Sequence, residues 1–181
     1  MKVDFEILSA VAEDSDAIAT LVNSGYRGEY SRQGWTHEDD ILSGTRIDAR
    51  GVRNLLGRSD TVVLKYVREG RILGCVELAH HDDKIYLGML TVDPANQALG
   101  IGRKLLAAGE EHARNLGCTS VYMTVIYTRR ELIEWYGRRG YCDTGKTKPF
   151  DNTDPVFGIP KRPIHFMVLE KHLGGLIRAE S

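Results

Sequence analysis

The sequence predicts a mixed α/β fold, and three observations support this class. Three runs rich in β-branched and apolar residues, 61–67, 72–79 and 85–92, follow one another with short polar turns between them, as in an antiparallel meander. The strongest amphipathic pattern in the chain comes next, over 100–115, with its apolar residues on one stripe. Other strand-like and helix-like segments precede and follow this block without a repeat or a linker, so we expect one domain.

The N-terminal part is expected to form one strand and three helical pieces. Residues 2–8 alternate between polar and apolar side chains, as a half-buried strand does. Capping residues precede a short helix over 17–22. A threonine followed three residues later by aspartate resembles an N-cap and predicts a short helix over 36–42, and a further helix is expected over 48–56.

The C-terminal part continues the alternation of strands and helices. A strand is predicted over 120–125, a helix over 129–138 and the start of another strand over 140–145. A loop rich in proline, glycine and aspartate then covers 148–163, and the last strand is expected over 164–169. The run 85–92 is apolar on both faces, so it should lie centrally in the sheet.

Composition excludes several classes of function. Lys and Arg total 24 against 25 Asp and Glu, so no basic excess indicates a nucleic-acid partner. No apolar stretch is long enough to cross a bilayer, and no signal-peptide core is present, so we expect no membrane partner and a cytoplasmic location. The three cysteines are scattered, and the histidines show no metal-ligand spacing, so neither disulfides nor a metal site is predicted.

The segment with the clearest chemical signal runs from a buried strand through a glycine-containing loop into the amphipathic helix. The first N–H groups of a helix lack intrahelical acceptors and carry partial positive charge, so they bind phosphate groups. Gly100 and Gly102 leave the backbone open to an anion, and Arg103 and Lys104 add cations at the same end. The sequence does not fit a P-loop or a dinucleotide fingerprint. Two glycines alone would also fit a plain turn.

Two motifs resemble those of the GNAT superfamily of acyl-CoA-dependent N-acetyltransferases. Gln97-x-x-Gly100-x-Gly102 matches the Gln/Arg-x-x-Gly-x-Gly/Ala motif of that superfamily. The segment from Tyr136 to Tyr141 looks like its Tyr-x-x-x-Gly-Phe/Tyr motif. The resemblance covers about 3–171 in element order, while the motifs lie within 87–141.

The resemblance implies a GNAT-type fold and a domain organisation. The expected fold is a twisted, mostly antiparallel sheet of six to seven strands that splays at an acyl-CoA cleft, with about four flanking helices. A single domain would span 1–181, with a strand and helices in 1–60, the acyl-CoA-binding core in 61–146, and a C-terminal loop and strand in 147–172.

The resemblance also implies a cofactor site for acetyl-CoA. Backbone amides of 97–102 would hold the pyrophosphate, and Leu90 and Val92 would pair with the pantetheine arm. The Leu90 N–H would polarise the thioester carbonyl. Arg129 stands where relatives often have an asparagine that contacts pantetheine. The implied cofactor-binding residues are Leu90, Thr91, Val92, Gln97, Ala98, Leu99, Gly100, Ile101, Gly102, Arg103, Lys104 and Arg129.

The catalytic residues are less well determined by the motifs. Tyr136 occupies the tyrosine position of the family, where a phenol can protonate the leaving thiolate; packing at a helix end is the alternative. An amine acceptor must lose a proton, because an alkyl amine is charged at neutral pH. Many relatives carry a glutamate where this chain has Tyr86. Glu77 is the candidate substitute, with a solvent-facing glutamate or a base-free water chain as alternatives.

The predicted function is transfer of an acetyl group from acetyl-CoA to the amine of a small molecule or peptide, by direct attack in a ternary complex. A non-catalytic acyl-CoA sensor and a structural or interaction domain are the alternatives. Acceptor residues are sought in the first helices and in the loop 150–157, where aromatic and acidic side chains would suit a cationic amine. A homodimer is one expectation, because dimers are common in the family. The candidate substrate-binding residues are Tyr26, Glu29, Trp35 and Tyr86.

Overall fold

The computed structural model describes residues 4–150 and 158–174, and its centre is one seven-stranded sheet in the order β1-β3-β4-β5-β6-β9-β7. All neighbours are antiparallel except β5 and β6. This architecture confirms the predicted mixed α/β class with a mostly antiparallel sheet. The strands are β1 (Phe5–Ser9), β3 (Thr61–Arg68), β4 (Arg71–His81), β5 (Lys84–Val92), β6 (Ser120–Ile126), β7 (Cys142–Pro149) and β9 (His165–His172).

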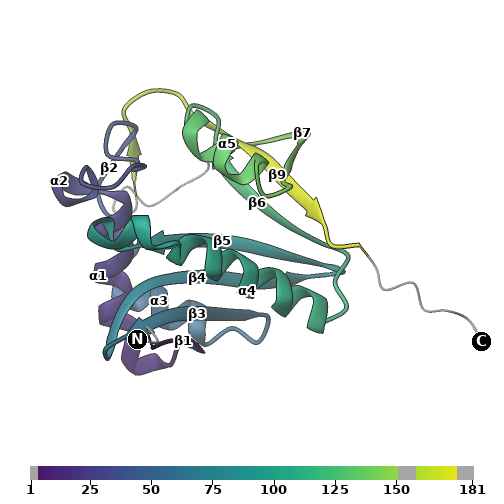
Figure 1. The fold of residues 1–181 in the computed structure, drawn as a ribbon. Helices are drawn as coiled ribbons and strands as arrows, with labels where there is room; N and C mark the ends of the chain where they lie inside the picture. Colours follow the sequence, from purple (N-terminus) through teal and green to yellow (C-terminus); the bar gives the residue numbers. More distant parts are fainter. Residues whose placement is uncertain (1–3, 151–157, 175–181) are drawn as a thin grey trace, which may run out of the picture.

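Helices cover both faces of this sheet (Figure 1). The described residues contain five α-helices and two short 3₁₀ helices, where the sequence predicted about four helices. They are η1 (Ala12–Asp14), α1 (Ser15–Tyr26), α2 (Gly28–Ser31), α3 (Ala49–Leu56), η2 (Pro94–Leu99), α4 (Ile101–Asn115) and α5 (Arg130–Gly137). The main core packs α4 and α5 against one face of the sheet, while a second core packs α1 and α3 against the other.

The predicted meander forms with small changes at its ends. β3, β4 and β5 pair in antiparallel register through turns at 69–70 and 82–83. Glu69 and Gly70 both have positive φ, as the tight turn of a hairpin requires. His80 and His81, which the sequence placed in a polar turn, instead extend β4 and pair with Ile85 and Lys84.

The sheet splays between β5 and β6. The two strands pair in parallel only from Lys84 to Tyr86, opposite residues 120–122, and diverge beyond that point (Figure 1). Within β5, Met89 has a φ of 53°, and the register with β4 shifts at this place. An unpaired extra residue of this kind is a β-bulge, which bends its strand. The bulge therefore turns the second half of β5 away from β6.

The helix predicted over 36–42 is absent, which corrects that prediction. Residues 36–41 form bends and turns, and β2 (Leu42–Ser43) pairs with β8 (Ile159–Pro160) in a separate small sheet. Ile41 and Leu42 pack with Ile126 in a third core cluster. The conformation of this segment depends on contacts with residues more than 80 positions away in the sequence. A capping pattern contains only local information and cannot predict such contacts. The helix predicted over 48–56 is confirmed, and the Asp48 carboxylate caps it by accepting from the Gly51 N–H at 2.7 Å.

Close contact between β4 and α4 gives a testable stability prediction. A Cβ added at Gly74 would lie 2.9 Å from both Ile101 Cγ2 and Leu105 Cδ1, and 3.0 Å from the Thr91 carbonyl oxygen. We expect Gly74→Ala to lower the free energy of unfolding by about 1–3 kcal/mol, as overpacking does. Gly137→Ala is the matched control, because a Cβ there meets no atom within 4 Å in the described structure. It should be neutral or stabilise by up to about 1 kcal/mol. Urea denaturation measures both, and equal effects would contradict the proposed packing.

Candidate active site

Two cavities meet where β5 and β6 separate. The glycine-loop cavity, of about 290 Å³, lies between η2, the start of α4 and α5. The arginine cavity, of about 550 Å³, lies between the splayed strands and the segment 26–55, and is named for Arg27, Arg46 and Arg129 in its lining. The two cavities share five lining residues, which are Tyr26, Leu90, Arg129, Leu132 and Tyr136.

The glycine loop opens directly onto the first turn of α4. The Asp93 carboxylate accepts from the Ala95 N–H at 3.0 Å and so starts η2. Gly100 follows with a φ of 73°, a left-handed conformation that favours glycine, and it is the N-cap of α4. The loop therefore presents the free amides of a fifteen-residue helix to the cavity.

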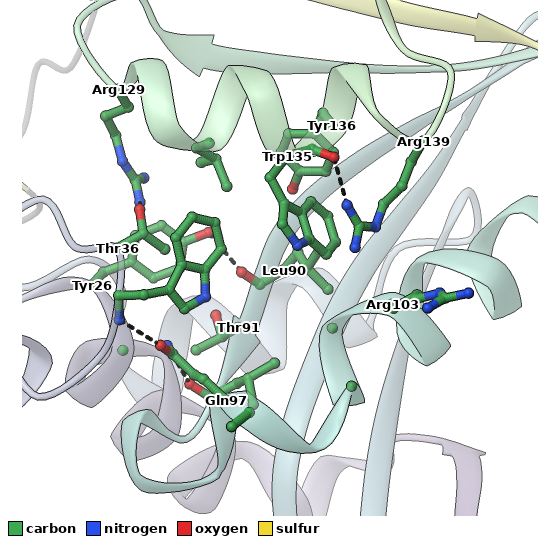
Figure 2. Close-up of a pocket in the computed structure, with 17 residues that line it drawn as sticks. Tyr26, Thr36, Leu90, Thr91, Gln97, Arg103, Arg129, Trp135, Tyr136 and Arg139 are labelled. Carbon is green, nitrogen blue, oxygen red and sulfur yellow. Dashed lines mark hydrogen bonds between the residues drawn. The ribbon is translucent and has the colours of Figure 1, made fainter.

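Two arginines line this cavity beside the helix start, Arg103 from α4 and Arg139 from the end of α5 (Figure 2). Arg139 Nη1 donates to the Trp135 carbonyl oxygen at 2.8 Å, and its guanidinium stacks 3.7 Å above the Trp135 ring. Its buried Nε has no hydrogen-bond partner in the described structure. Burial lowers the pKa of Arg139, and the positive charges of Arg138 and Arg103 lower it further. Mutually repelling cations around helix amides form a site that suits a phosphate group.

The other predicted cofactor-binding residues of the loop differ in what their side chains do. Ala98 lines the cavity, whereas Leu99 is exposed and Ile101 is fully buried in the main core. The Lys104 ammonium lies 4.2 Å from the centre of the Phe5 ring, and Lys104 is not among the described lining residues. Lys104 is therefore removed from the predicted set of phosphate-facing cations.

Gln97 uses its side chain to hold the loop. Its Oε1 accepts from the Trp35 N–H at 2.9 Å, and its Nε2 donates to the Val92 carbonyl oxygen at 3.4 Å (Figure 2). A Cβ at Gly34 would lie 2.6 Å from Gln97 Oε1, so glycine is needed for this approach. Gln97 thus joins η2 to the 34–35 segment, and only its backbone is left to face a ligand.

The junction of the cavities is built around the bulge in β5. Met89 and Leu90 have no registered partner on β4 or β6 in the described sheet. The Leu90 carbonyl oxygen accepts from the Tyr26 hydroxyl at 3.0 Å, and Thr91 is buried with its hydroxyl donating to the Met89 carbonyl oxygen at 3.0 Å. The bulge is therefore held from the α1 side and open toward the cavities.

Tyr136 lies at this junction on α5. Its side chain lines both cavities, packs edge-on against Trp135 and Tyr141, and has no hydrogen-bond partner among the described residues. Burial, with the nearby Tyr26 phenol, raises the pKa of Tyr136, while the cations of Arg129 and Arg139 act in the opposite direction. The phenol therefore stays protonated at neutral pH with its hydroxyl available to a ligand.

Arg129 is held mainly by other protein groups. Its Nη1 lies 3.0 Å from Glu38 Oε1, and its Nη2 donates to the Thr36 hydroxyl. Glu38 Oε2 lies 3.2 Å from Arg27 Nη2, so one buried carboxylate joins two buried arginines. Arg129 lines both cavities from this network, which fixes the start of α5 to the 36–38 segment. Its predicted contact with the cofactor stays a prediction.

Glu77 and Tyr86 lie on neighbouring strands over the α1 and α3 face of the sheet. Glu77 pairs with Gly88, and the Tyr86 ring covers Gly88 so closely that a Cβ there would lie 2.7 Å from it. Tyr86 lines the arginine cavity, whereas Glu77 is not among the described lining residues of either cavity. Burial raises the pKa of Glu77, and nearby cations, Arg46 foremost, oppose that shift.

The structure places the predicted acceptor residues in different parts of the site. Tyr26 and Tyr86 line the arginine cavity. Trp35 instead lines the glycine-loop cavity, 6.3 Å from the Trp135 ring, and Glu29 is exposed on α2 and outside both described linings. Glu29 and Trp35 are therefore removed from the acceptor side. Phe150 lines the arginine cavity, while the rest of the predicted acceptor loop, 151–157, lies outside the described residues.

Comparisons with known proteins assign this chain to a family. The description "Acetyltransferase (GNAT) family" matches residues 17–141. The chain therefore belongs to the GNAT acetyltransferase family, whose members catalyse acyl transfer.

Individual relatives agree with this assignment. An acetyltransferase of Agrobacterium fabrum, Atu2258, is 31% identical over 78 residues, which is 43% of this chain and 56% of that protein. The chain thus spans little more than half the length of this curated relative.

Solved structures share the fold. The ribosomal-protein-S18-alanine N-acetyltransferase from Escherichia coli superposes with a TM-score of 0.71 at 13% identity, covering 98% of this chain and 99% of that one. The PaiA N-acetyltransferase from Thermoplasma acidophilum, solved in complex with coenzyme A, has a TM-score of 0.65 at 17% identity and covers 93% and 99%. At these identities the likeness concerns the fold.

Two further properties of the described residues bear on the site. No helix in the described ranges is long and apolar enough to cross a membrane. Within 4–150 and 158–174, no group of three or more His, Cys, Asp or Glu side chains is arranged to hold a metal ion. The residues that sequence reasoning missed, Arg46 and Arg139, give no motif signal beyond the position of Arg139 just before Gly140-Tyr141.

Proposed function

We propose that the protein transfers an acetyl group from acetyl-CoA to the amine of a small molecule or peptide, by direct attack in a ternary complex. The observation that carries this proposal is the junction of the two cavities at the β5 bulge. Leu90 and Tyr136 both line this junction, and the Tyr136 hydroxyl has no hydrogen-bond partner among the described residues. The glycine-loop cavity has groups suited to the phosphates of acetyl-CoA, and the arginine cavity offers a second space for the amine. The two substrates can therefore meet at the junction that the cavities share.

The glycine-loop cavity fits the coenzyme A part of the donor. Helix amides at Gly100 and the next turn, with Arg103 and Arg139, would bind the pyrophosphate. The buried Arg139 Nε supplies a donor that lacks an acceptor among the described residues. The open backbone of Leu90 and Val92 would pair with the pantetheine arm. This places the thioester at the junction, where the Leu90 N–H would stabilise the negative charge that develops on the carbonyl oxygen.

At neutral pH the acceptor is an ammonium ion, so it first loses one proton to solvent and becomes a neutral amine. The reaction of the neutral amine then needs two further proton movements. The amine nitrogen attacks the thioester carbonyl carbon, the C–N bond forms, the C–S bond breaks, and the electron pair of that bond leaves with the sulfur. Tyr136 donates its phenolic proton to that sulfur, and the cations of Arg129 and Arg139 stabilise the phenol oxygen as it becomes negative. The attacking nitrogen loses one proton to a base, and that proton restores the phenol through solvent.

We propose Glu77 as the base, acting through water because it is not among the described lining residues. Burial raises the pKa of Glu77 toward neutral pH. A general base works best when its pKa lies near the pH at which the enzyme operates. The value of kcat/KM should therefore rise with pH as Glu77 loses its proton. Glu77→Gln should lower kcat/KM by roughly 10²-fold and remove this part of the pH profile. Glu69→Gln, in the exposed β3–β4 turn, is the control. An unchanged pH profile in Glu77→Gln would exclude Glu77 as the base.

The proposed role of Tyr136 is tested by removing one oxygen atom. Tyr136→Phe should lower kcat by roughly 10²-fold while leaving acetyl-CoA affinity nearly unchanged, because the phenol acts on the leaving sulfur. The measurement is thiol release with a panel of amines. Tyr141→Phe is the matched control, since the Tyr141 hydroxyl donates to Glu110 at 3.1 Å inside the core. Equal kcat values for Tyr136→Phe and wild type would refute the role.

The phosphate site is tested by calorimetry with acetyl-CoA. Arg139→Gln and Arg103→Gln should each weaken binding by about tenfold, because a charge-assisted hydrogen bond is lost. Higher salt should reduce the difference from wild type. Lys104→Gln should change affinity by less than about twofold, because its ammonium contacts the Phe5 ring. If Lys104→Gln weakened binding as much as the two arginine variants, the assignment of the cavity would be wrong.

A non-catalytic acyl-CoA sensor is the second candidate, and one observation favours it. Glu38 is the one carboxylate among the described lining residues of the arginine cavity, and two arginines hold it. A sensor would bind acetyl-CoA in calorimetry without releasing thiol in the presence of any amine. Thiol release that depends on an amine would exclude the sensor.

A further inference from the structure

The arginine cavity has an excess of positive charge. Its charged lining residues are three arginines and Glu38. Both oxygens of Glu38 are in use, since Oε1 lies 3.0 Å from Arg129 Nη1 and Oε2 lies 3.2 Å from Arg27 Nη2. One carboxylate is therefore shared by two arginines, and Glu131 Oε1 lies 3.8 Å from Arg129 Nε as a second partner of Arg129. Arg46 forms no ion pair within 4.0 Å among the described residues.

The backbone of Arg46 is held in place, yet its guanidinium has no polar partner among the residues that the structure describes. Its backbone N–H donates to Asn23 Oδ1 at 2.7 Å, which holds the residue beside α1. The guanidinium carbon lies 5.7 Å from the centre of the Tyr26 ring. In the described part of the chain this guanidinium makes no hydrogen bond and no ion pair within 4.0 Å, although it lines the cavity. The planar guanidinium of this lining residue thus carries N–H donors that no described residue uses.

Such an arrangement leaves the hydrogen-bond donors of the guanidinium free for a ligand. A cation removed from bulk water loses hydration, and a protein normally compensates this loss with a nearby anion. The carboxylates of Glu38 and Glu77 lie beyond ion-pair distance of Arg46, although their charges and those of the Tyr26 and Tyr86 phenols together outweigh burial and raise the pKa of Arg46. A guanidinium binds a carboxylate through two parallel hydrogen bonds, so a carboxylate of the ligand is the natural partner.

The other residues that line the arginine cavity indicate that the rest of the ligand is apolar. Leu42, Ile47, Leu55, Phe150 and Phe166 line the same cavity with apolar surface. The junction at Leu90 and Tyr136, where the reacting amine must be placed, borders the same cavity. Tyr26 of this junction donates to the Leu90 carbonyl oxygen, and its ring centre lies 5.7 Å from the Arg46 guanidinium carbon. A molecule held by its carboxylate at Arg46 would bury an apolar body in this cavity and direct its amine toward the thioester.

We propose that the acceptor is an amine that also carries a carboxylate, such as an apolar or aromatic amino acid, and that Arg46 binds this carboxylate. This inference rests on the proposed acetyl transfer and names the class of its acceptor. It replaces the expectation of a purely cationic amine, because among the described lining residues no carboxylate is left to bind a second positive charge.

The test compares each acceptor with its own uncharged counterpart. Apolar and aromatic amino acids, each paired with its amide, and spermidine as a cationic amine, are assayed with acetyl-CoA for thiol release. The acids should have kcat/KM values about ten- to hundredfold above those of the amides, the range expected for a charge-assisted bidentate contact. Arg46→Gln should remove this preference, and Arg46→Lys should keep part of it. Arg50→Gln, on the exposed side of α3, is the matched control and should keep all of it.

Direct binding keeps the inference testable if turnover is slow. The N-acetyl amino acids and their amides, which are the products, are titrated into the protein loaded with coenzyme A. The acids should bind more tightly to wild type, and Arg46→Gln should bind both equally. Equal or preferred binding of amides, a preference for spermidine, an unchanged preference in Arg46→Gln, or no binding of any probe would overturn the inference.

These outcomes are separable from failure of the proposed function. An Arg46→Gln protein that binds acetyl-CoA like wild type is folded, because its glycine-loop cavity is intact. If acids and amides reacted equally, the proposed acetyl transfer would be supported, but the proposal that the acceptor carries a carboxylate would be wrong. If wild type bound the acid products selectively and released no thiol with any acceptor, the catalytic proposal would fall and the acceptor site would stand.

Discussion

The site depends on the early end of pairing between β5 and β6. A parallel pair that continued past Tyr86 would close the sheet and leave no room between the strands. The bulge at Met89 turns β5 away, and its backbone remains unpaired on the side that faces the cavities. Both cavities, and the position of Tyr136 between them, follow from this separation. The bulge has a positive φ at a non-glycine residue, a conformation that surrounding packing must maintain.

Four of the arginines that line the two cavities fall into two groups. Arg27 and Arg129 share Glu38, and Arg129 Nε also lies 3.8 Å from Glu131 Oε1, so both arginines are ion-paired within the chain and hold the 26–38 segment against α5. Arg139 and Arg46 are placed by backbone hydrogen bonds and aromatic rings, which orient a guanidinium without neutralising it. Each faces a cavity. The uncompensated cations therefore mark where anionic groups of ligands are expected, and the compensated ones mark structural contacts.

The elements that the sequence predicted well are those with strong local signals. The meander, α3, α4 and α5 arise from periodicity and turn residues close together in the chain. The segment 36–43 was mispredicted because its partners, Ile126 and β8, are distant in sequence. Arg46 could not be recognised as a site residue for the same reason. Its surroundings come from α1, β5 and the segment around Glu38, and no spacing in the sequence records that they converge.

The sequence by itself determined the family motifs and the glycine loop, because a left-handed Gly100 before an amphipathic helix is a local property of adjacent residues. Only the tertiary structure decided which cations face ligands. Lys104 follows Arg103 directly, yet its ammonium lies on the Phe5 ring across the sheet edge, whereas Arg139, 36 positions further along, lines the same cavity as Arg103. The direction of a side chain depends on what packs around it, and that packing exists only once the chain has folded.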